Sequence, residues 1–237
     1  MLFRSGELIS RGLNNFLDVE LMEIIWSFAR RNVMNAKIFD VAEKEILSRG
    51  VSGFRTHELV LILYSFVRAK RDGVNINFVK NIEAELCLRS TEEFDSGHLS
   101  QMIWSLGKLN MSESELFDVA EAEVLKCNMH KMSRAEKVML LRGFINGQRG
   151  SKELFQSLYS SISAKDLSNL NEAQICEFVW CFSLANIQAD KLFDFLENEI
   201  LNSAKYHFTS KQRSVILKSF LRAGKGSKAL LNFLKQV

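Results

Sequence analysis

Large apolar residues recur along the chain at one regular interval. The first column of such residues is spaced by 38 to 40 positions: Phe28, Phe66, Leu106, Phe144, Phe182 and Phe220. The second column is Phe39, Phe78, Phe117, Phe155, Phe193 and Leu231, and the third is Phe16, Phe54, Phe94, Met132, Leu170 and Phe208. Three apolar columns with one shared interval are typical of a structural unit that is repeated and stacked. The pattern therefore predicts six repeats rather than one globular core around a catalytic centre.

Each unit holds two stretches with helical periodicity, which we call helix A and helix B. In unit one they are expected over about residues 18–30 and 35–47. Helix A places Leu21, Ile24, Ile25 and Phe28 on one side, as an amphipathic helix does. Polar residues that could cap helix A follow the third column: Asp18, Thr56, Ser96, Ser133, Asn171 and Thr209. Unit two has two extra residues, near 72–73 and 90–93, where turns are expected.

The expected fold class is all-α, an α-solenoid of about six ~38-residue helix-turn-helix repeats with a short N-terminal helix. Residues 1–15 are expected to form a capping helix or a presequence-like segment, because the first 13 residues hold two arginines and one acid. Residues 16–237 are expected to form one solenoid domain, with repeats at approximately 16–53, 54–93, 94–131, 132–169, 170–207 and 208–237. The chain has no proline, which permits helix almost everywhere.

Two further positions of helix A follow the same interval. A small residue stands just before the first column in every unit, which predicts a close approach of neighbouring helices: Ser27, Ser65, Ser105, Gly143, Cys181 and Ser219. The position before it, which we call the anchor position, is mostly aromatic: Trp26, Tyr64, Trp104, Arg142, Trp180 and Lys218. These anchors fit a packing seam between helices, and stacking on nucleic-acid bases is the alternative.

The helix-A strings LMEIIWSFARR, LVLILYSFVRA and ICEFVWCFSLANI and the helix-B strings LFDVAEAEVL and LFDFLENEIL resemble a known repeat family. They are similar to the octotricopeptide and heptatricopeptide repeats of algal and apicomplexan organellar proteins, over about residues 16–236. The resemblance implies an α-solenoid that binds RNA in an organelle. Many relatives carry a C-terminal domain of the RAP type, and we expect none here because the chain ends with helix B of unit six.

Basic residues gather two positions after the first column and in the turns that follow. The RNA-binding residues predicted from this stripe are Arg30, Arg31, Arg68, Lys70, Arg71, Lys108, Arg149 and Arg222. In a stacked array one position becomes one line along the surface, and a line of cations can follow a phosphate backbone. The alternative is that these cations only offset the helix dipole at the ends of helices A.

Protein contacts are predicted at two other places. Helix B of units one, three and five carries acidic pairs on one face, which are expected to be solvated or to dock a basic partner: Asp40, Glu43, Asp118, Glu121, Asp194 and Glu197. The last helix is expected to leave an uncapped apolar end that needs a neighbour: Leu230, Leu231, Phe233 and Leu234. An isolated chain with such an end is expected to be poorly soluble.

Sequence motifs of catalysis are missing from the chain. It has no phosphate loop, nucleophile elbow, dinucleotide fingerprint or zinc-ligand spacing, so we expect no enzyme, no catalytic or metal-binding residues, no cofactor and no small-molecule substrate. No apolar run approaches the ~20 residues of a membrane span, so no membrane insertion is expected. The four cysteines have no paired spacing and are expected to be reduced, mostly packing residues.

These observations predict a non-catalytic RNA-binding protein of the mitochondrial matrix. The net charge of +3 is mild and six units are few. We therefore expect a structural component of the mitochondrial ribosome that contacts ribosomal RNA and neighbouring proteins. The alternatives are a protein–protein scaffold subunit of a mitochondrial complex and a transcript-specific factor for RNA stability or processing.

Overall fold

The protein is all-helical in the computed structural model, which describes residues 8, 11–31, 36–69, 73–203 and 205–235. Helices A of the six units are α2 (Asp18–Arg30), α4 (Thr56–Ala69), α6 (Ser96–Lys108), α8 (Arg134–Asn146), α11 (Glu172–Leu184) and α13 (Ser210–Arg222). Helices B are α3 (Ala36–Arg49), α5 (Ile76–Cys87), α7 (Leu116–Lys126), α9 (Lys152–Ser160), α12 (Asp190–Asn202) and α14 (Lys228–Lys235). Every predicted helix A and helix B is therefore present.

Short helical turns connect most helices B to the next unit. They are the 3-10 turns η1 (Val51–Gly53), η2 (Thr91–Glu93) and η3 (Met129–Lys131), and the four-residue helix α10 (Ala164–Leu167) in unit four. In units two to five, the residue of the third apolar column follows such a turn: Phe54, Phe94, Met132 and Leu170. From Phe54 onward, the residues of this column are buried. Each turn thus holds an apolar residue against the core just before the next helix A begins.

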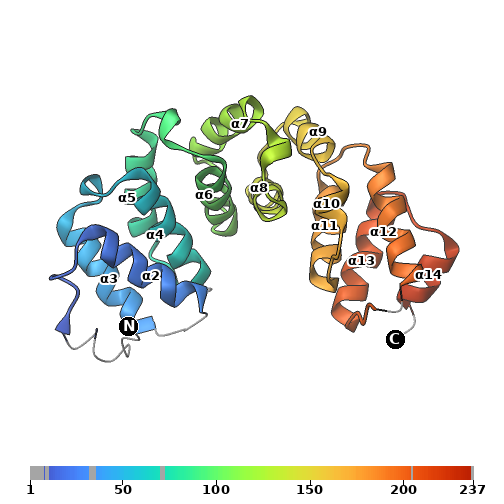
Figure 1. The fold of residues 1–237 in the computed structure, drawn as a ribbon, viewed down its shortest axis with the longest axis horizontal. Helices are drawn as coiled ribbons and strands as arrows, with labels where there is room; N and C mark the ends of the chain where they lie inside the picture. The colour runs from blue at the N-terminus through green and yellow to red at the C-terminus, as the bar shows by residue number, and fades with distance from the viewer. Residues whose placement is uncertain (1–7, 9–10, 32–35, 70–72, 204, 236–237) are drawn as a thin grey trace.

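The helix pairs follow one another along an arc (Figure 1). Helices A lie on the inner side of this arc and helices B on its outer side. Each helix A packs against the helix A of the next unit, from α2 on α4 to α11 on α13. Contacts between successive helices B are fewer, as for α5 on α7 and α12 on α14. Close packing on one side and looser packing on the other bends the row of helices toward the A side.

The core runs the length of the arc and is formed by the three apolar columns. Phe39 packs edge-on against Phe66 of the next unit with ring centroids 5.2 Å apart. Phe193 and Phe220 repeat this contact between units five and six at 5.2 Å. Helix B of one unit thus inserts an aromatic ring against helix A of the next. The column residues that remain half-exposed lie at the two ends: Phe16, Phe28 and Leu231.

The small residues before the first column allow the close approach that the sequence predicts. Ser65, Ser105, Cys181 and Ser219 are at most 1% exposed. At Gly143, an added Cβ would lie only 2.5 Å from the carbonyl oxygen of Ile103, so the backbones of α6 and α8 touch. Ser27 of unit one is exposed. In the later units this position is therefore covered by the preceding helix A, and α2 is the first helix A that the structure describes.

The helix caps agree with the prediction in the last three units only. Ser133, Asn171 and Thr209 are N-caps, and each side chain accepts a hydrogen bond from the third residue of its helix. Helices α2, α4 and α6 begin at the predicted capping residue itself, so the cap lies one residue earlier. Asp95 caps α6, while Glu20 and Glu58 accept from the backbone N–H groups of Leu17 and Arg55.

The C-terminal helix is not the open apolar end that the sequence predicts. Leu230 is 0% exposed and Leu234 is 3% exposed, because α14 packs against α13 and α12. Leu231 and Phe233 are half-buried, and the Arg213 guanidinium lies 5.3 Å from the centre of the Phe233 ring. The prediction of an exposed apolar end is therefore wrong at Leu230 and Leu234, whereas Leu231 and Phe233 remain partly exposed.

The N-terminal prediction lies largely outside the described residues. Of residues 1–15, Leu8 and Leu13 are buried against the core. Arg49 holds the following turn, because its guanidinium donates to the carbonyl of Phe16 at 2.8 Å and to the Asp18 carboxylate at 2.7 Å. No helix in the described part of the chain combines the length and apolar character needed to cross a bilayer.

Candidate nucleic-acid interface

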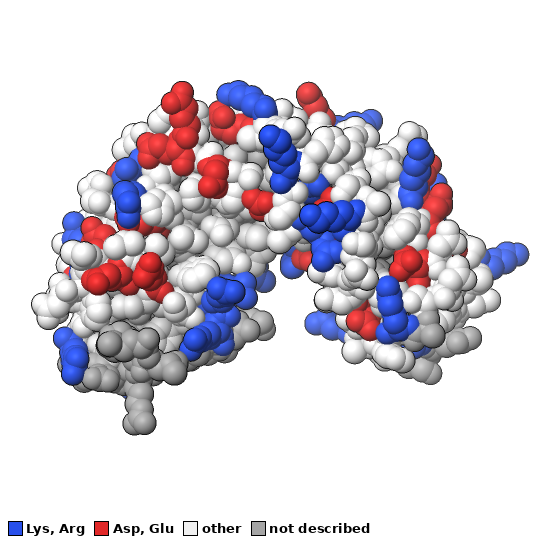
Figure 2. All heavy atoms as spheres, viewed as in Figure 1, with Lys and Arg blue, Asp and Glu red and all other residues white. Residues whose placement is uncertain are grey.

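The predicted basic stripe is exposed at the ends of the inner helices. Arg30, Arg31, Arg68, Lys108 and Arg222 are all exposed. Lys70 and Arg71 fall outside the described residues. Figure 2 shows groups of Lys and Arg atoms along the inner edge of the arch beside its N-terminal half, with Asp and Glu atoms more toward the outer side there. The cations of the stripe are thus carried by the helices that line the concave side.

A hollow of about 260 Å³ lies between α2 and α4 on this stripe. We call it the first groove, and it is lined by Trp26, Ala29, Arg30, Tyr64, Arg68 and Gln101. The Arg30 guanidinium lies 5.1 Å from the centre of the Trp26 ring, and that of Arg68 lies 5.9 Å from the Tyr64 ring. Arg68 also donates a hydrogen bond of 2.9 Å to the Tyr64 hydroxyl. Two cations and two aromatic rings therefore border one open space.

Equivalent grooves farther along the arc have different chemistry. Between α8 and α11, a hollow of about 510 Å³ is lined by Ile145, Asn146, Gln148, Arg149, Phe155, Trp180 and Leu184. The residue at its anchor position, Trp180, is aromatic. However, Asn146 and Leu184 occupy the positions two residues after the first column, where Arg30 and Arg68 stand in units one and two. Beside this hollow, Arg142 occupies the anchor position of unit four and pairs with Glu177 of α11 at 2.5 Å. The line of cations is interrupted here.

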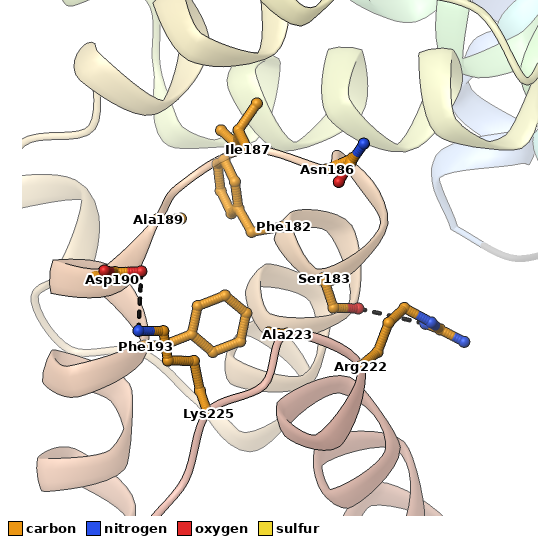
Figure 3. A pocket seen from close by; sticks show the side chains of 10 residues that line it. All are labelled: Phe182, Ser183, Asn186, Ile187, Ala189, Asp190, Phe193, Arg222, Ala223 and Lys225. Atoms are coloured by element: carbon orange, nitrogen blue, oxygen red, sulfur yellow. Dashed lines mark hydrogen bonds and ion pairs between the residues drawn. The ribbon is translucent and has the colours of Figure 1, made fainter.

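The groove between units five and six is small and closed by polar contacts. It has a volume of about 130 Å³. Figure 3 shows it between the turn that follows α11 and the end of α13. Arg222 donates to the hydroxyl of Ser183 at 3.3 Å, and Lys225 pairs with Asp190 at 3.0 Å. Both cations at this groove already have partners within the protein.

Arg149 serves a contact between repeats and not an open cationic surface. Its guanidinium forms a short ion pair with Asp118 of α7 and donates to the carbonyl of Ser112 at 2.9 Å. The Asp118 carboxylate raises the pKa of Arg149 further through this hydrogen bond. Among the predicted RNA-binding residues that the structure describes, Arg149 is therefore the one whose charge is offset by an ion pair within the protein.

Some residues of the acidic pairs on helices B form contacts between successive repeats. The glutamate of each pair reaches the N-cap residue of helix B in the next unit. Glu43 accepts from the side-chain amide of Asn75 at 2.6 Å, Glu121 from the backbone N–H of Ser151 at 3.0 Å, and Glu197 from that of Ser227 at 3.0 Å. We call these contacts the glutamate clasps. Of the pairs' aspartates, Asp194 is exposed and Asp118 pairs with Arg149.

Replacing Glu197 by alanine is expected to destabilise the protein by about 1 kcal/mol. The clasp to Ser227 is a charge-assisted hydrogen bond at the protein surface, where such bonds contribute modestly. Asp194→Ala is the matched control, because it removes an exposed carboxylate from the same helix; its unfolding free energy should stay within about 0.5 kcal/mol of the parent. Urea unfolding followed by circular dichroism measures both. Equal losses in the two variants would contradict the clasp.

The cysteines follow the prediction only in part. Cys181 is buried and Cys176 half-buried, whereas Cys87 and Cys127 are exposed. Burial raises the pKa of the Cys176 thiol to about 11 and raises that of Cys181 as well. Both thiols therefore stay protonated at neutral pH. Within the described residues, no group of three or more His, Cys, Asp and Glu side chains could hold a metal ion.

Comparison with known proteins assigns no relative. No model of a known protein family matches the chain, and no curated protein matches its sequence.

Sequence reasoning missed two features of this surface. Gln101 comes from α6, five residues before the first column, yet it lines the first groove between α2 and α4. The bridge from Arg142 to Glu177 was equally unexpected. Arg142 replaces an aromatic anchor in its unit, and this break in the pattern was the signal that could have pointed to a changed groove.

Proposed function

We propose that the protein is a non-catalytic α-solenoid that binds RNA along its inner helices. The packing of each helix A on the next, with a helix B behind it, supports the solenoid. The observation that carries the RNA proposal is the first groove, where Arg30 and Arg68 are exposed beside Trp26 and Tyr64. Cations that track phosphates and rings that stack on bases are the usual elements of single-strand binding.

The proposed setting is the mitochondrial ribosome, as a component that contacts ribosomal RNA and neighbouring proteins. The likeness of the repeats to the octotricopeptide and heptatricopeptide family supports an organelle. The small number of exposed, unpaired cations along the described part of the arc supports a component that is held in a larger particle by other contacts as well. A free transcript factor would depend on its own phosphate contacts alone. Crosslinking in intact organelles tests this. Crosslinks at fixed ribosomal RNA positions are expected, and crosslinks on messenger RNA would favour a transcript factor.

The triple variant Arg30→Glu, Arg68→Glu, Lys108→Glu is expected to abolish binding to single-stranded RNA. Three phosphate contacts account for a slope of about 2 in the dependence of log K on log salt for a single strand, so binding by the parent should weaken with salt at least this steeply. The matched control is Lys44→Glu, Lys80→Glu, Lys191→Glu on outer helices B, where all three lysines are exposed. Both triples shift the net charge equally. Fluorescence anisotropy at several salt concentrations measures the difference, and equal losses in the two triples would refute the stripe.

A protein scaffold is the second candidate, and an observation on the outer side favours it. Between α3 and α5 a hollow of about 300 Å³ is bordered by Leu47 and Leu88. Leu88 is 81% exposed and Leu47 is 42% exposed, so two large apolar side chains border this hollow at the surface. If RNA binding is absent, and Leu88→Ser releases the protein from its native assembly, the scaffold replaces the RNA proposal.

A further inference from the structure

The first groove has the parts of a site for one unstacked nucleotide. Its walls come from two neighbouring helices, with the ring of Trp26 on α2 and that of Tyr64 on α4. Both rings are half-buried, so each is held in place on one side and accessible on the other. Aromatic rings held in this way are stacking platforms that accept any base.

The cations of the groove are placed over the same rings. Arg30 follows Trp26, and Arg68 follows Tyr64, by one helical turn, so each cation and ring share a helix face. The guanidinium groups lie 5.1 Å and 5.9 Å from the ring centres. A base that stacks on either ring would take the place of the guanidinium, and the displaced arginine could then bind the flanking phosphate with two parallel hydrogen bonds.

Gln101 adds a group that can distinguish bases. Its side-chain amide carries both a donor and an acceptor, and it lines the groove from the third helix, α6. An amide of this kind can form two hydrogen bonds with a base edge. The groove thus combines stacking, charge and an edge-reading group.

The neighbouring positions cannot form the same site. Tyr64 and Trp104 are in edge-to-face contact with ring centroids 5.2 Å apart, so a base does not fit between them. Farther along, the Arg142–Glu177 bridge joins α8 to α11. The groove at Trp180 has an aromatic wall but Asn146 and Leu184 in place of the two arginines. Among the grooves described above, only the first groove combines two aromatic rings with two exposed arginines.

The shape of the site selects the form of the nucleic acid. The groove is a hollow of about 260 Å³ bordered by side chains of α2, α4 and α6. A base inside a duplex is covered on its faces by stacked neighbours and at its edge by its pairing partner, so it must leave the stack to enter such a hollow. Single strands, loops and bulges can turn a base outward at little cost.

Resting on the proposed RNA-binding function, we propose that the first groove binds one unstacked nucleotide of a single-stranded RNA. Trp26 and Tyr64 stack on the base, Arg30 and Arg68 bind the flanking phosphates, and Gln101 reads the base edge. The nucleotide therefore fixes the position of the strand on the N-terminal half of the arc.

The test compares Trp26→Leu with Trp180→Leu, which removes the same residue from the same position in unit five. Labelled RNAs about 12 nucleotides long, within the usual site size, are titrated as single strands and as duplexes. Trp26→Leu should weaken single-strand binding roughly 5- to 150-fold, the range for one stacked base. Trp180→Leu should leave the affinity unchanged, and the parent should bind the single strand more tightly than the duplex.

Three further readouts separate the possible outcomes. Gln101→Leu should reduce the difference in affinity between oligo-U, oligo-A and oligo-C without abolishing binding. Tyr64→Leu replaces Trp26→Leu if the latter loses its helical signal. A free mononucleotide should bind far more weakly than the strand, and equal affinity would overturn the assignment to RNA in favour of a nucleotide site.

The failure of this inference differs from the failure of the proposed function. If the duplex binds as tightly as the single strand, or if Trp26→Leu and Trp180→Leu behave alike, the nucleotide site is wrong. RNA binding that still depends on Arg30, Arg68 and Lys108 would then leave the proposed function standing. If the parent protein binds no RNA at low salt, both fail together.

Discussion

Lys137→Met is expected to lower the free energy of unfolding by about 3–5 kcal/mol, the usual cost of removing one partner from a buried ion pair. Lys137 is 2% exposed and stands where units one, two, three and five carry an apolar residue of helix A. Its ammonium group donates to the Asp166 carboxylate at 2.8 Å and to the carbonyl of Ser161 at 2.8 Å. The pair joins α8 to the short helix α10, and methionine would leave the buried Asp166 carboxylate without its cation.

The pH dependence of this loss follows from the Asp166 carboxyl. Burial by itself raises the pKa of Asp166, but hydrogen bonds from Lys137 and Ser163 lower it below the ordinary value. A lowered pKa in the folded state stabilises the protein above the unfolded pKa of about 3.9, and this contribution is lost as the pH falls through the folded value. Without the hydrogen bond from Lys137, burial raises the pKa of Asp166, and the carboxyl takes up a proton more readily. The deficit of Lys137→Met should therefore be larger at about pH 7 than at about pH 4.

The double variant Lys137→Met, Asp166→Asn is the control. Asparagine removes the unpaired charge and can still accept the hydrogen bond that Asp166 receives from the backbone N–H of Ser163 at 2.9 Å. We expect it to recover a measurable part of the lost stability at neutral pH. Urea unfolding of the three proteins, followed by circular dichroism at both pH values, gives the comparison. A Lys137→Met variant within about 1 kcal/mol of the parent would show that the pair is not essential.

Gly143→Ala is expected to destabilise the protein by about 1–3 kcal/mol through overpacking. In an unhindered helix, replacing glycine by alanine stabilises the helix by about 1 kcal/mol. At Gly143 we therefore expect a change in stability of the opposite sign. The added Cβ would lie 2.5 Å from the carbonyl oxygen of Ile103 and 2.7 Å from its Cγ2 atom. A backbone oxygen cannot rotate away as a side chain can, and α6 and α8 would have to separate.

Gly53→Ala is the matched control for this change, because no heavy atom lies within 4 Å of its added Cβ. Its stability should stay within about 0.5 kcal/mol of the parent. Thermal unfolding of Gly143→Ala, Gly53→Ala and the parent tests the pair of expectations. A Gly143→Ala protein that melts above the parent would mean that the helices have room to move apart.

Much of the fold follows from local pattern. The first column and the spacing of Leu21, Ile24 and Ile25 determine where helices form, since an amphipathic stripe is a property of the chain itself. The predicted range of 18–30 for the first helix A is the range of α2. Caps were predicted less well. The choice between Asp95 and Ser96 depends on which side chain reaches the N–H of His98, and spacing alone does not determine this.

The site was predictable only as a list of positions. Arg30, Arg68 and Arg149 look alike in the sequence, yet Arg149 lies against Asp118 of the preceding unit. Glu43, Glu121 and Glu197 likewise look like a solvated face until the neighbouring N-cap residues are seen beside them. Such partners are 30 to 32 residues apart, and which ones meet depends on how one repeat is rotated against the next.

The sequence by itself determined that the chain is helical, where its helices lie, and which residues recur at equivalent positions. These features depend on periodicity and on the size of side chains, and both are visible in the linear sequence. Only the tertiary structure decided which cations remain open and which are paired, that Leu230 and Leu234 are covered, and that Trp26, Tyr64 and Gln101 border one groove. The reason is physical: a groove between two helices is formed by residues about one repeat apart, and its shape depends on the distance and angle at which the repeats pack.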